Sequence, residues 1–343
     1  MAEKFSRWRD PATGIAPFLV PLSTSGTDSL PPALQLVTVP VAALLGAIRG
    51  LLVVLLILAQ TVLVEGILLI FSPVPPIHAA LTRACNASLA RLVLLVLGVV
   101  FIKVETVQLR KTGRSPPSVP FDPRKGDVVI ANSSSPLDLL YLAFRYNATF
   151  LLPVAASSTT SSSNKVAGWR RVTLLSAILA SGQLPQLGAA AESLDEAVKK
   201  AVGPVVVFPE GTTSNNRALL KLAEIAAPGA CVKSSPLRTF VLAFKYPAPT
   251  ALAPSLTYPI PTPSPLSGLL SHLYALASRL TPYTFSVRRL HASEAPKLSA
   301  HPTRDEWDAL GDALAGTARL KKVGGLGWVE KGAFLEFRRL KGR

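Results

Sequence analysis

An almost unbroken apolar run, residues 36–71, restricts what this chain can fold into. Leu, Val, Ile, Ala and Gly fill most of it, and the polar or helix-breaking interruptions are Thr38, Pro40, Arg49, Gln60, Thr61 and Glu65. Because about 20 apolar residues cross a bilayer, the run is long enough for one tilted span or a tight hairpin. Two buried core helices are the alternative. We expect insertion, with Arg49 and Glu65 paired across a hairpin or directed to the two interfaces.

The composition agrees with contact between the chain and a membrane. The chain of 343 residues is 49% hydrophobic, more than one soluble core of this size needs. Its formal net charge of +16 favours an anionic membrane surface or a phosphorylated substrate over nucleic acid, because the basic residues lie near apolar runs rather than among aromatic residues. Cys85 and Cys231 form neither a disulfide framework nor a metal-binding pattern, so we expect a reducing compartment and no metal.

The apolar run divides the chain into segments. Residues 1–35 are a Pro-, Ser- and Thr-rich cytosolic leader without a signal-peptide layout, and residues 36–72 are the membrane segment. A second apolar helix over 80–103 is short enough to lie at the interface, and the basic residues that follow it place the rest of the chain on the cytosolic side. Residues 301–343 form a basic tail that suits an anionic lipid surface or a merely soluble end.

Residues 104–300 are the predicted main domain, and their pattern is α/β. Short β-type runs at 127–130, 150–152, 205–208, 240–244 and 283–287 alternate with helical segments. This alternation predicts a mixed sheet flanked by helices. A Ser/Thr tract at 157–163 predicts a loop, and Trp169-Arg170-Arg171 before an apolar helix predicts an interface anchor.

Two polar stretches follow predicted strands. Residues 208–217 combine a glycine, hydroxyls, amides and Arg217, which together could cradle a phosphate; an ordinary turn with a solvated Glu210 is the alternative. Residues 132–138, Asn-Ser-Ser-Ser-Pro-Leu-Asp, could bind a ligand through their hydroxyls. Ser and Asp before an apolar helix are also typical of an N-cap, and the stretch alone favours capping.

Together the two stretches resemble the first and third motifs of the glycerolipid acyltransferase family, Asn-His-x-Ser-x-x-Asp and Phe-Pro-Glu-Gly-Thr. The third motif, Phe-Pro-Glu-Gly-Thr, matches at 208–212 without a gap. The leader, Trp-Arg-Asp-x-x-Thr-Gly-Ile-Ala-Pro-Phe-Leu at 8–19, further resembles fungal lysophosphatidic acid:oleoyl-CoA acyltransferases, a subgroup linked to vacuolar sorting and lipid droplets. The resemblance implies acyl-CoA-dependent acylation of lysophosphatidic acid at the endoplasmic reticulum or lipid-droplet membrane, with no cofactor.

The resemblance assigns the catalytic motif to Asn132, Ser133, Ser135 and Asp138. In the family the motif histidine is the general base and the aspartate orients it. Ser133 stands at the histidine position, and no histidine occurs between His78 and His272. Three accounts stay open: Asp138 acts as base directly or through Ser133 or water, the substrate phosphate takes the proton, or the domain binds lipid without catalysis.

By the same resemblance, the glycerol phosphate of the acceptor contacts the third motif and its extension: Phe208, Pro209, Glu210, Gly211, Thr212, Thr213, Asn215 and Arg217. Lys245 is expected near the CoA phosphates, or else as a solvated strand end. The second family motif, at 182–187, lacks its usual arginine, which implies altered acceptor affinity. The expected partners are a lysophospholipid, acyl-CoA and the bilayer. A sorting adaptor that recruits partners through its leader is a further alternative.

Overall fold

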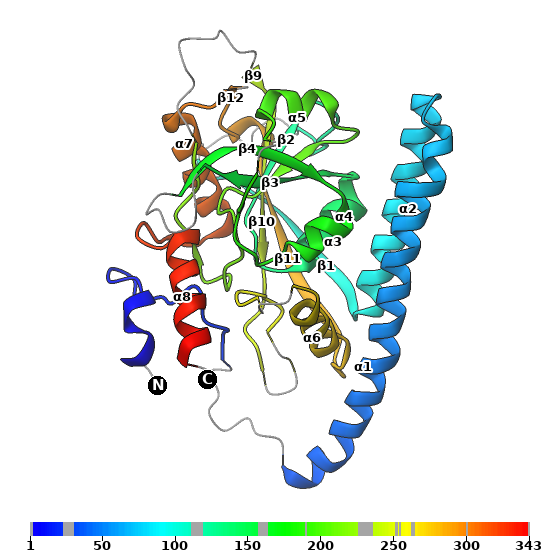
Figure 1. Cartoon of the computed structure of the whole chain (residues 1–343), viewed down its shortest axis with the longest axis vertical. Coiled ribbons are helices and arrows are strands. Elements are labelled where there is room, and N and C mark those ends of the chain that lie inside the picture. Colours follow the sequence, from blue (N-terminus) through cyan, green and yellow to red (C-terminus); the bar gives the residue numbers. More distant parts are fainter. Residues whose placement is uncertain are drawn as a thin grey trace.

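The computed structural model describes residues 3–22, 31–110, 119–156, 164–188, 191–225, 236–250, 253, 255–261, 265–299 and 301–341 (Figure 1). The predicted loop at 157–163 and Cys231 lie outside these residues. The described part consists of a mixed sheet with helices on both faces and a long helical pair along one side. The predicted α/β class is confirmed.

The main sheet determines where the polar stretches can meet. Its order is β1 (Val99–Val107), β11 (Tyr283–Leu290), β10 (Thr239–Lys245), β2 (Val128–Ala131), β6 (Val205–Val207), β3 (Thr149–Ala155), β4 (Lys165–Val172) and β8 (Glu224–Ile225), with β5 (Gln186–Leu187) beside β3. The pairs β10–β11 and β3–β4 are antiparallel and the other pairs are parallel. Two small pairs, β7 (Ala218–Leu219) with β13 (Lys321–Lys322) and β9 (Pro236–Leu237) with β12 (Leu298–Ser299), complete the strands of the described part.

Alternating side chains give the sheet two buried faces. In β2, Val129 and Ala131 pack into one core and Val128 and Ile130 into the other, as the period of two requires. The first core is covered by α3 (Pro136–Tyr146), α4 (Leu174–Leu179), α6 (Pro265–Ala277) and the end of α2 (Pro75–Val96). The second is covered by α5 (Leu194–Lys200) and α7 (Arg304–Ala318). All five predicted strands are confirmed.

The predicted apolar helix over 80–103 is wrong after Val96, where the chain leaves the helix and forms a strand. The helix α2 stops at Val96, and Gly98 adopts a φ of 90°, a left-handed conformation that terminates helices and favours glycine. The next residues form β1, which pairs in parallel with β11. A short run of Val, Phe and Ile suits a strand as well as a helix, and here the free edge of β11 determines the outcome.

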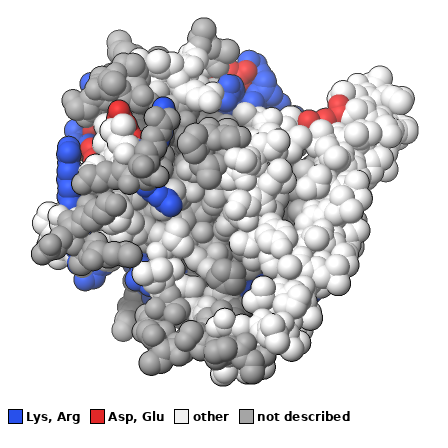
Figure 2. All heavy atoms as spheres, turned by 60° about the horizontal axis from the view of Figure 1, so that its bottom comes forward, with Lys and Arg blue, Asp and Glu red and all other residues white. Residues whose placement is uncertain are grey.

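The apolar run forms a helical rod rather than a hairpin of its own. The helix α1 (Pro32–Gln60) continues through η2 (Thr61–Gly66) and η3 (Ile67–Phe71), and α2 returns alongside it. The segments Leu34–Phe71 and Pro76–Val96 are each long and apolar enough to cross a membrane. Figure 2 shows this pair as the almost uncharged, white right-hand side of the molecule.

Arg49 has a role that the sequence did not predict. Its guanidinium donates to the carbonyls of Arg279 (2.9 Å) and Ala277 (3.5 Å), at the carboxyl end of α6. A cation at that helix end satisfies unpaired carbonyls and interacts favourably with the helix dipole. The expected pairing with Glu65, or extension to an interface, is therefore replaced by a bond that fastens α1 to the domain.

The two ends of the chain pack together, beside each other in Figure 1. The leader, which contains η1 (Glu3–Trp8), meets α8 (Trp328–Lys341), and Trp8, Phe18 and Phe334 are buried in a shared aromatic cluster. The described part of the expected tail, residues 301–341, thus contains α7, β13 and α8 and is packed on the domain rather than peripheral. Trp169 is also buried, against Trp307, so it is not an interface anchor.

Replacing Arg49 should loosen α1 from the domain. We expect Arg49→Met to lower the stability of the purified protein by about 2 kcal/mol, because bonds from a charged donor to two carbonyls are lost. The measurement is thermal unfolding in detergent micelles. Ile48→Met, at a 52% exposed neighbour, is the control and should unfold like wild type. Equal unfolding temperatures for both variants would contradict the assigned role.

Candidate functional site

The candidate site lies where three parallel strands end. The strands β2, β6 and β10 run in the same direction, so their carboxyl ends share one edge of the sheet. Residues 132–135 follow β2 and are called the Asn132 loop; residues 208–217 follow β6 and are called the Glu210 loop. Tyr246 follows β10. The sheet topology therefore brings together stretches that are far apart in the sequence.

Hydrogen bonds join the Asn132 loop to the Glu210 loop. The Ser133 N–H donates to Glu210 Oε2 (3.0 Å), and the Ser214 N–H donates to the Ser133 carbonyl (3.0 Å). The other oxygen of Glu210 accepts the N–H of Leu220 (2.9 Å). Glu210 is fully buried, and burial raises the pKa of its carboxyl to about 7. Glu210 therefore acts inside the structure as a bridge, rather than as the solvated turn residue that the sequence left open.

Two asparagines hold both loops against β10. Asn132 exchanges hydrogen bonds with the backbone of Phe244, at 2.7 and 3.1 Å. Asn216, in the left-handed conformation at a φ of 61°, donates to Ser134 Oγ and to the Phe244 carbonyl, both at 2.9 Å. Both side chains are buried. Asn216 was not among the predicted site residues. It follows Asn215 in the same polar loop, and the sequence has no feature that distinguishes the roles of these two asparagines.

Ser135 and Asp138 cap α3. Ser135 is the N-cap residue, and one oxygen of Asp138 accepts the N–H groups of Ser134 (2.8 Å) and Ser135 (3.0 Å). The Tyr246 hydroxyl donates to the other oxygen. Among the described residues, no hydrogen bond joins Asp138 to the Ser133 hydroxyl. Asp138 is thus held in a buried capping arrangement, and its part in catalysis stays a prediction.

A small crevice lies between the two loops. Its volume is about 40 Å³, and it is lined by Ser133, Phe208, Gly211, Thr212 and Thr213 together with residues of α4, β3 and the turn at 181–183. Five predicted site residues therefore share one surface. Ser133, at the histidine position of the motif, is the member of the first motif that reaches it.

Two more of the predicted binding residues support the Glu210 loop from outside the crevice. Asn215 donates from its side-chain amide to the carbonyls of Ala16 (2.8 Å) and Leu19 (2.9 Å), which ties the leader to the loop. The Pro209 carbonyl accepts the N–H of Ala223 (2.8 Å). The Asn215 contacts therefore connect the leader to the third-motif loop.

The two predicted cations do not line the crevice. The side chain of Arg217 is exposed, in the same loop. Lys245 projects to the α7 face of the sheet, as Val241 and Ala243 do, and lies near Arg288 and Arg319. The crevice is on the opposite face, with α3 and α4. The structure therefore does not bring Lys245 to the crevice, and a CoA contact for it stays a prediction.

Lys331, in α8, is a site residue that the sequence did not indicate. Its ammonium donates to Thr212 Oγ1 (2.8 Å), the Thr213 carbonyl (2.8 Å) and Thr213 Oγ1 (3.2 Å). The Thr212 hydroxyl then donates to the Gln183 carbonyl (3.1 Å). Lys331 is fully buried, and burial lowers the pKa of its ammonium to about 7 while Glu210 opposes that change. One lysine of the expected basic tail is thus the cation behind the crevice.

Gly211 shows why α8 and the Glu210 loop fit together. Its φ of 68° is left-handed, and a Cβ built on it would lie 2.3 Å from the Trp328 ring. Any larger residue would be strained by the backbone and would also displace α8. The glycine of the Phe-Pro-Glu-Gly-Thr motif therefore lets the chain's last helix close over the loop.

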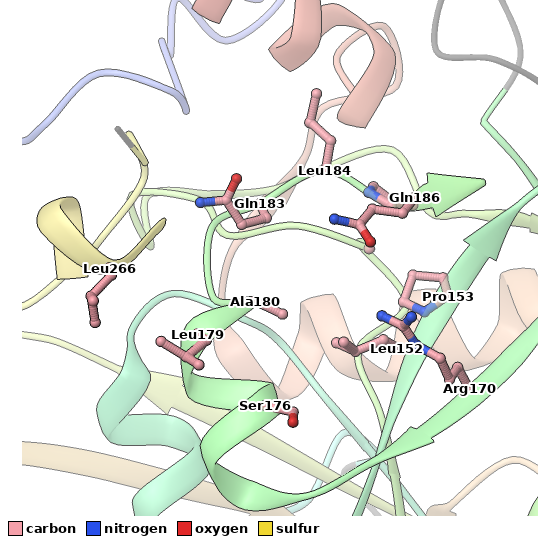
Figure 3. Close-up of a pocket in the computed structure, with 12 residues that line it drawn as sticks. Leu152, Pro153, Arg170, Ser176, Leu179, Ala180, Gln183, Leu184, Gln186 and Leu266 are labelled. Atoms are coloured by element: carbon pink, nitrogen blue, oxygen red, sulfur yellow. The ribbon is translucent and has the colours of Figure 1, made fainter. Parts of the chain in front are cut away.

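The crevice opens into a larger apolar groove of about 520 Å³ (Figure 3). Both are bounded by Leu152, Pro153, Ala180, Gln183 and Gly211. Further along, the labelled side chains in Figure 3 include apolar Leu179, Leu184 and Leu266, with Ser176, Gln186 and Arg170 as polar ones. Arg170 was read from sequence as part of an interface anchor; its exposed side chain is at this groove instead.

His272 does not replace the missing motif histidine. It lies on α6, outside the residues that line the crevice, with its ring stacked on Tyr258 at 4.8 Å. Burial lowers the pKa of its imidazole to about 4, so it is a weak base. Within the described ranges, no group of three or more His, Cys, Asp or Glu side chains could hold a metal ion.

Removing the Lys331 ammonium should disorganise the Glu210 loop. We expect Lys331→Met to lower stability by about 3 kcal/mol, because three charge-assisted bonds are lost and Glu210 is left without its nearest buried cation. Thermal unfolding in detergent micelles measures the loss. Lys321→Met, at an exposed lysine on β13, should change little. A Lys331→Met protein as stable as this control would contradict the assigned contacts.

The stability contribution of Asp138 should depend on pH. Burial raises its pKa from 3.8 to about 7, although three accepted hydrogen bonds oppose the shift. Between about pH 4 and pH 7 the folded protein then keeps a proton that the unfolded chain has released, so stability from this group falls as pH rises. We expect the unfolding-temperature advantage of wild type over Asp138→Asn to shrink across that range and then level off. An advantage that grows instead would show that the accepted bonds outweigh burial.

Comparison with known proteins identifies the family of the chain. No family model matches the chain. A "Putative lysophosphatidic acid:oleoyl-CoA acyltransferase" of Schizosaccharomyces pombe is 30% identical over 270 residues, which cover 76% of this chain and 77% of that protein. The crystal structure of the 1-acyl-sn-glycerophosphate (LPA) acyltransferase PlsC from Thermotoga maritima aligns at a TM-score of 0.39 and 15% identity, over 80% of this chain and 98% of that one. The chain belongs to the lysophosphatidic acid acyltransferase family.

Proposed function

We propose that this protein transfers the acyl group of an acyl-CoA to the free hydroxyl of lysophosphatidic acid, forming phosphatidic acid and CoA. One observation carries the proposal. The Asn132 and Glu210 loops are hydrogen-bonded to each other beside a crevice that contains Ser133, Thr212 and Thr213 and opens into an apolar groove. A substrate with a phosphate at one end and an acyl chain at the other matches this combination.

The acceptor phosphate is assigned to the Glu210 loop. Among the described hydrogen bonds, the backbone N–H groups of Thr212 and Thr213 have no acceptor, and they follow a left-handed Gly211. Successive N–H groups in such a turn form a concave anion site. Lys331 adds a positive charge behind them, and Arg217 supplies an exposed cation in the same loop. Glu210 positions the loop rather than contacting the phosphate.

The acyl-CoA is assigned to the groove. Its apolar wall, which includes Leu152, Leu179, Ala180 and Leu266, suits an acyl chain, since each buried methylene contributes about 0.8 kcal/mol. Arg170 lies in the same lining and is positioned to contact the CoA phosphates, a role the sequence assigned to Lys245. The thioester would then lie between the groove and Ser133.

The proton released by the acceptor hydroxyl needs a base, and the acceptor's own phosphate fits best. Asp138 is buried and both of its oxygens already accept hydrogen bonds. The Ser133 hydroxyl alone is too weak a base near neutral pH. The hydroxyl attacks the thioester carbonyl and its proton passes to the phosphate directly or through water. The carbon–sulfur bond then breaks, and the phosphate returns the same proton to the leaving sulfur, so CoA leaves as the thiol. Positioning of the two substrates would supply much of the rate.

The helical pair supports a proposed membrane location. We assign α1 and α2 to the endoplasmic reticulum membrane or the phospholipid surface of the lipid droplet, with the α/β domain facing the cytosol. Support comes from their length and their exposed apolar side chains. The groove includes Leu266 of α6, and α6 packs on α1, so an acyl chain would have a short path from the lipid phase.

A lipid-binding protein without catalysis is the second candidate. It is favoured by one observation: among the residues that line the crevice there is no histidine, carboxylate or other strong base. Such a protein would use the same crevice and groove to hold lysophosphatidic acid or an acyl-CoA in lipid-droplet organisation or vacuolar sorting.

Acyl transfer to lysophosphatidic acid is the test of the proposed function. Purified protein in detergent micelles is given labelled oleoyl-CoA and lysophosphatidic acid, and phosphatidic acid is measured. We expect Ala180→Trp, which fills the junction of crevice and groove, to lower the rate more than tenfold, whereas Ala309→Trp, on the exposed face of α7, leaves it unchanged. No phosphatidic acid above background with wild type would end the enzyme proposal.

Ser133→His separates a working site from an idle one. If the acceptor phosphate serves as base, restoring the imidazole should change the rate by less than about tenfold, because general-base catalysis is already supplied. A gain of a hundredfold or more would mean that the natural site lacks a base and would favour the lipid-binding candidate. Retention of lysophosphatidic acid by an inactive wild type would point the same way.

A further inference from the structure

A further cavity lies at the β1 edge of the sheet, and its lining residues are separate from those of the crevice. Its volume is about 500 Å³, and it is lined by three arginines, Arg91 of α2, Arg145 of α3 and Arg289 of β11. Aromatic and aliphatic side chains complete it: Tyr141, Phe144, Val100, Phe101, Ile102 and Val104. The residues that line the crevice and the groove do not overlap with this set. It is called the arginine cavity here.

The three arginines have no carboxylate partners. Among the described residues, none of them forms an ion pair. The carboxylate of the neighbouring strand, Glu105, pairs with Lys103 (2.8 Å) and Arg288 (3.4 Å). Glu105 is not among the residues that line the cavity. The positive charge of the cavity is therefore uncompensated.

Two of the guanidinium groups are held in place. Arg91 donates to the carbonyls of Val99 (3.2 Å) and Val100 (2.8 Å). Arg289 donates to the Tyr141 hydroxyl (3.1 Å) and lies over the rings of Phe121 and Tyr146. The Arg289 Nε is buried and has no hydrogen-bond partner. Groups that are already oriented lose little entropy when an anion binds.

The rim of the cavity is apolar and adjoins the membrane-type helices. Phe101 is 74% exposed, and Val100 and Val104 are also exposed, on a strand that forms the edge of the sheet. The strand begins three residues after α2 ends, and Arg91 is near that end of α2. If α2 lies in the bilayer, its end and the cavity are at the level of the lipid headgroups. Arginine and aromatic residues are typical of that level.

We propose that the arginine cavity binds the headgroup phosphate of an anionic membrane phospholipid, with the lipid's acyl chains against Phe101 and α2. Arginine binds phosphate through paired hydrogen bonds, and the exposed apolar rim matches the glycerol and upper acyl region. The site is separate from the acyl-transfer crevice and does not depend on catalysis. It rests on the proposed insertion of α1 and α2.

Short-chain lipids test the site in solution. The full-length protein in dodecyl maltoside is titrated with dihexanoyl phosphatidylglycerol, dihexanoyl phosphatidylcholine or inorganic phosphate, and the rise in unfolding temperature gives an apparent affinity. We expect phosphatidylglycerol to bind best. Arg145→Gln should weaken it about fivefold, as expected when one basic side chain contributes about 1 kcal/mol. Arg145 is exposed and makes no described contact, so its replacement should leave folding intact.

Controls distinguish the sources of binding. Arg9→Gln, at an exposed arginine of the leader, should bind phosphatidylglycerol like wild type. Equal protection by phosphatidylcholine, or unchanged affinity in Arg145→Gln and Arg91→Gln, would overturn the proposal. Inorganic phosphate that protects as well as phosphatidylglycerol would also overturn it, because the site would then recognise free anions.

A spectroscopic readout checks lipid contact directly. The four natural tryptophans, Trp8, Trp169, Trp307 and Trp328, are buried. Phe101→Trp, in vesicles of phosphatidylglycerol brominated on the acyl chains, should therefore lose fluorescence well beyond the wild-type protein. Flotation of wild type with the same vesicles tests membrane insertion separately. If wild type floats but Phe101→Trp shows no extra quenching, the lipid site at the arginine cavity is contradicted, whereas membrane insertion is not.

Discussion

The buried carboxylate of Glu210 is the interaction on which the candidate site depends. It accepts the backbone N–H groups of Ser133 and Leu220, so one side chain determines the spacing of the two motif loops. A buried charge is costly unless it is paired and hydrogen-bonded. Lys331 supplies a nearby positive charge and bonds to Thr212 and Thr213, so α8, the last helix, completes a site whose other parts lie in the middle of the chain.

The arrangement also explains why the chain's ends are folded onto the domain. The leader is bound through Asn215, and its aromatic residues pack on α8, which carries Lys331 and Trp328. The crevice, the groove, α6 and the α1–α2 pair all lie on one face of the sheet. The proposed phosphate site, which the leader and α8 support, thus borders an apolar path toward the membrane-type helices. This arrangement would suit a reaction between two amphipathic substrates.

Much of this was predictable from the sequence. Short β-type runs between helical segments predicted the strands, and polar loops after two of them predicted which segments would meet. The family resemblance added roles. The start of β1 was missed because Leu92 to Ile102 has a composition that suits either a helix or a strand. Lys331 was missed because its partner Thr212 is 119 residues away, and among the lysines of the last segment nothing local sets it apart. Asp138 was read as catalytic or capping, and the capping bonds are present.

The most direct test of the account is a structure of the protein with lysophosphatidic acid bound. The account predicts the phosphate in the crevice, within about 3 Å of the N–H groups of Thr212 and Thr213, and the acyl chain directed toward Ala180. A phosphate found elsewhere, such as beside Lys245 on the α7 face, with the crevice empty, would contradict it.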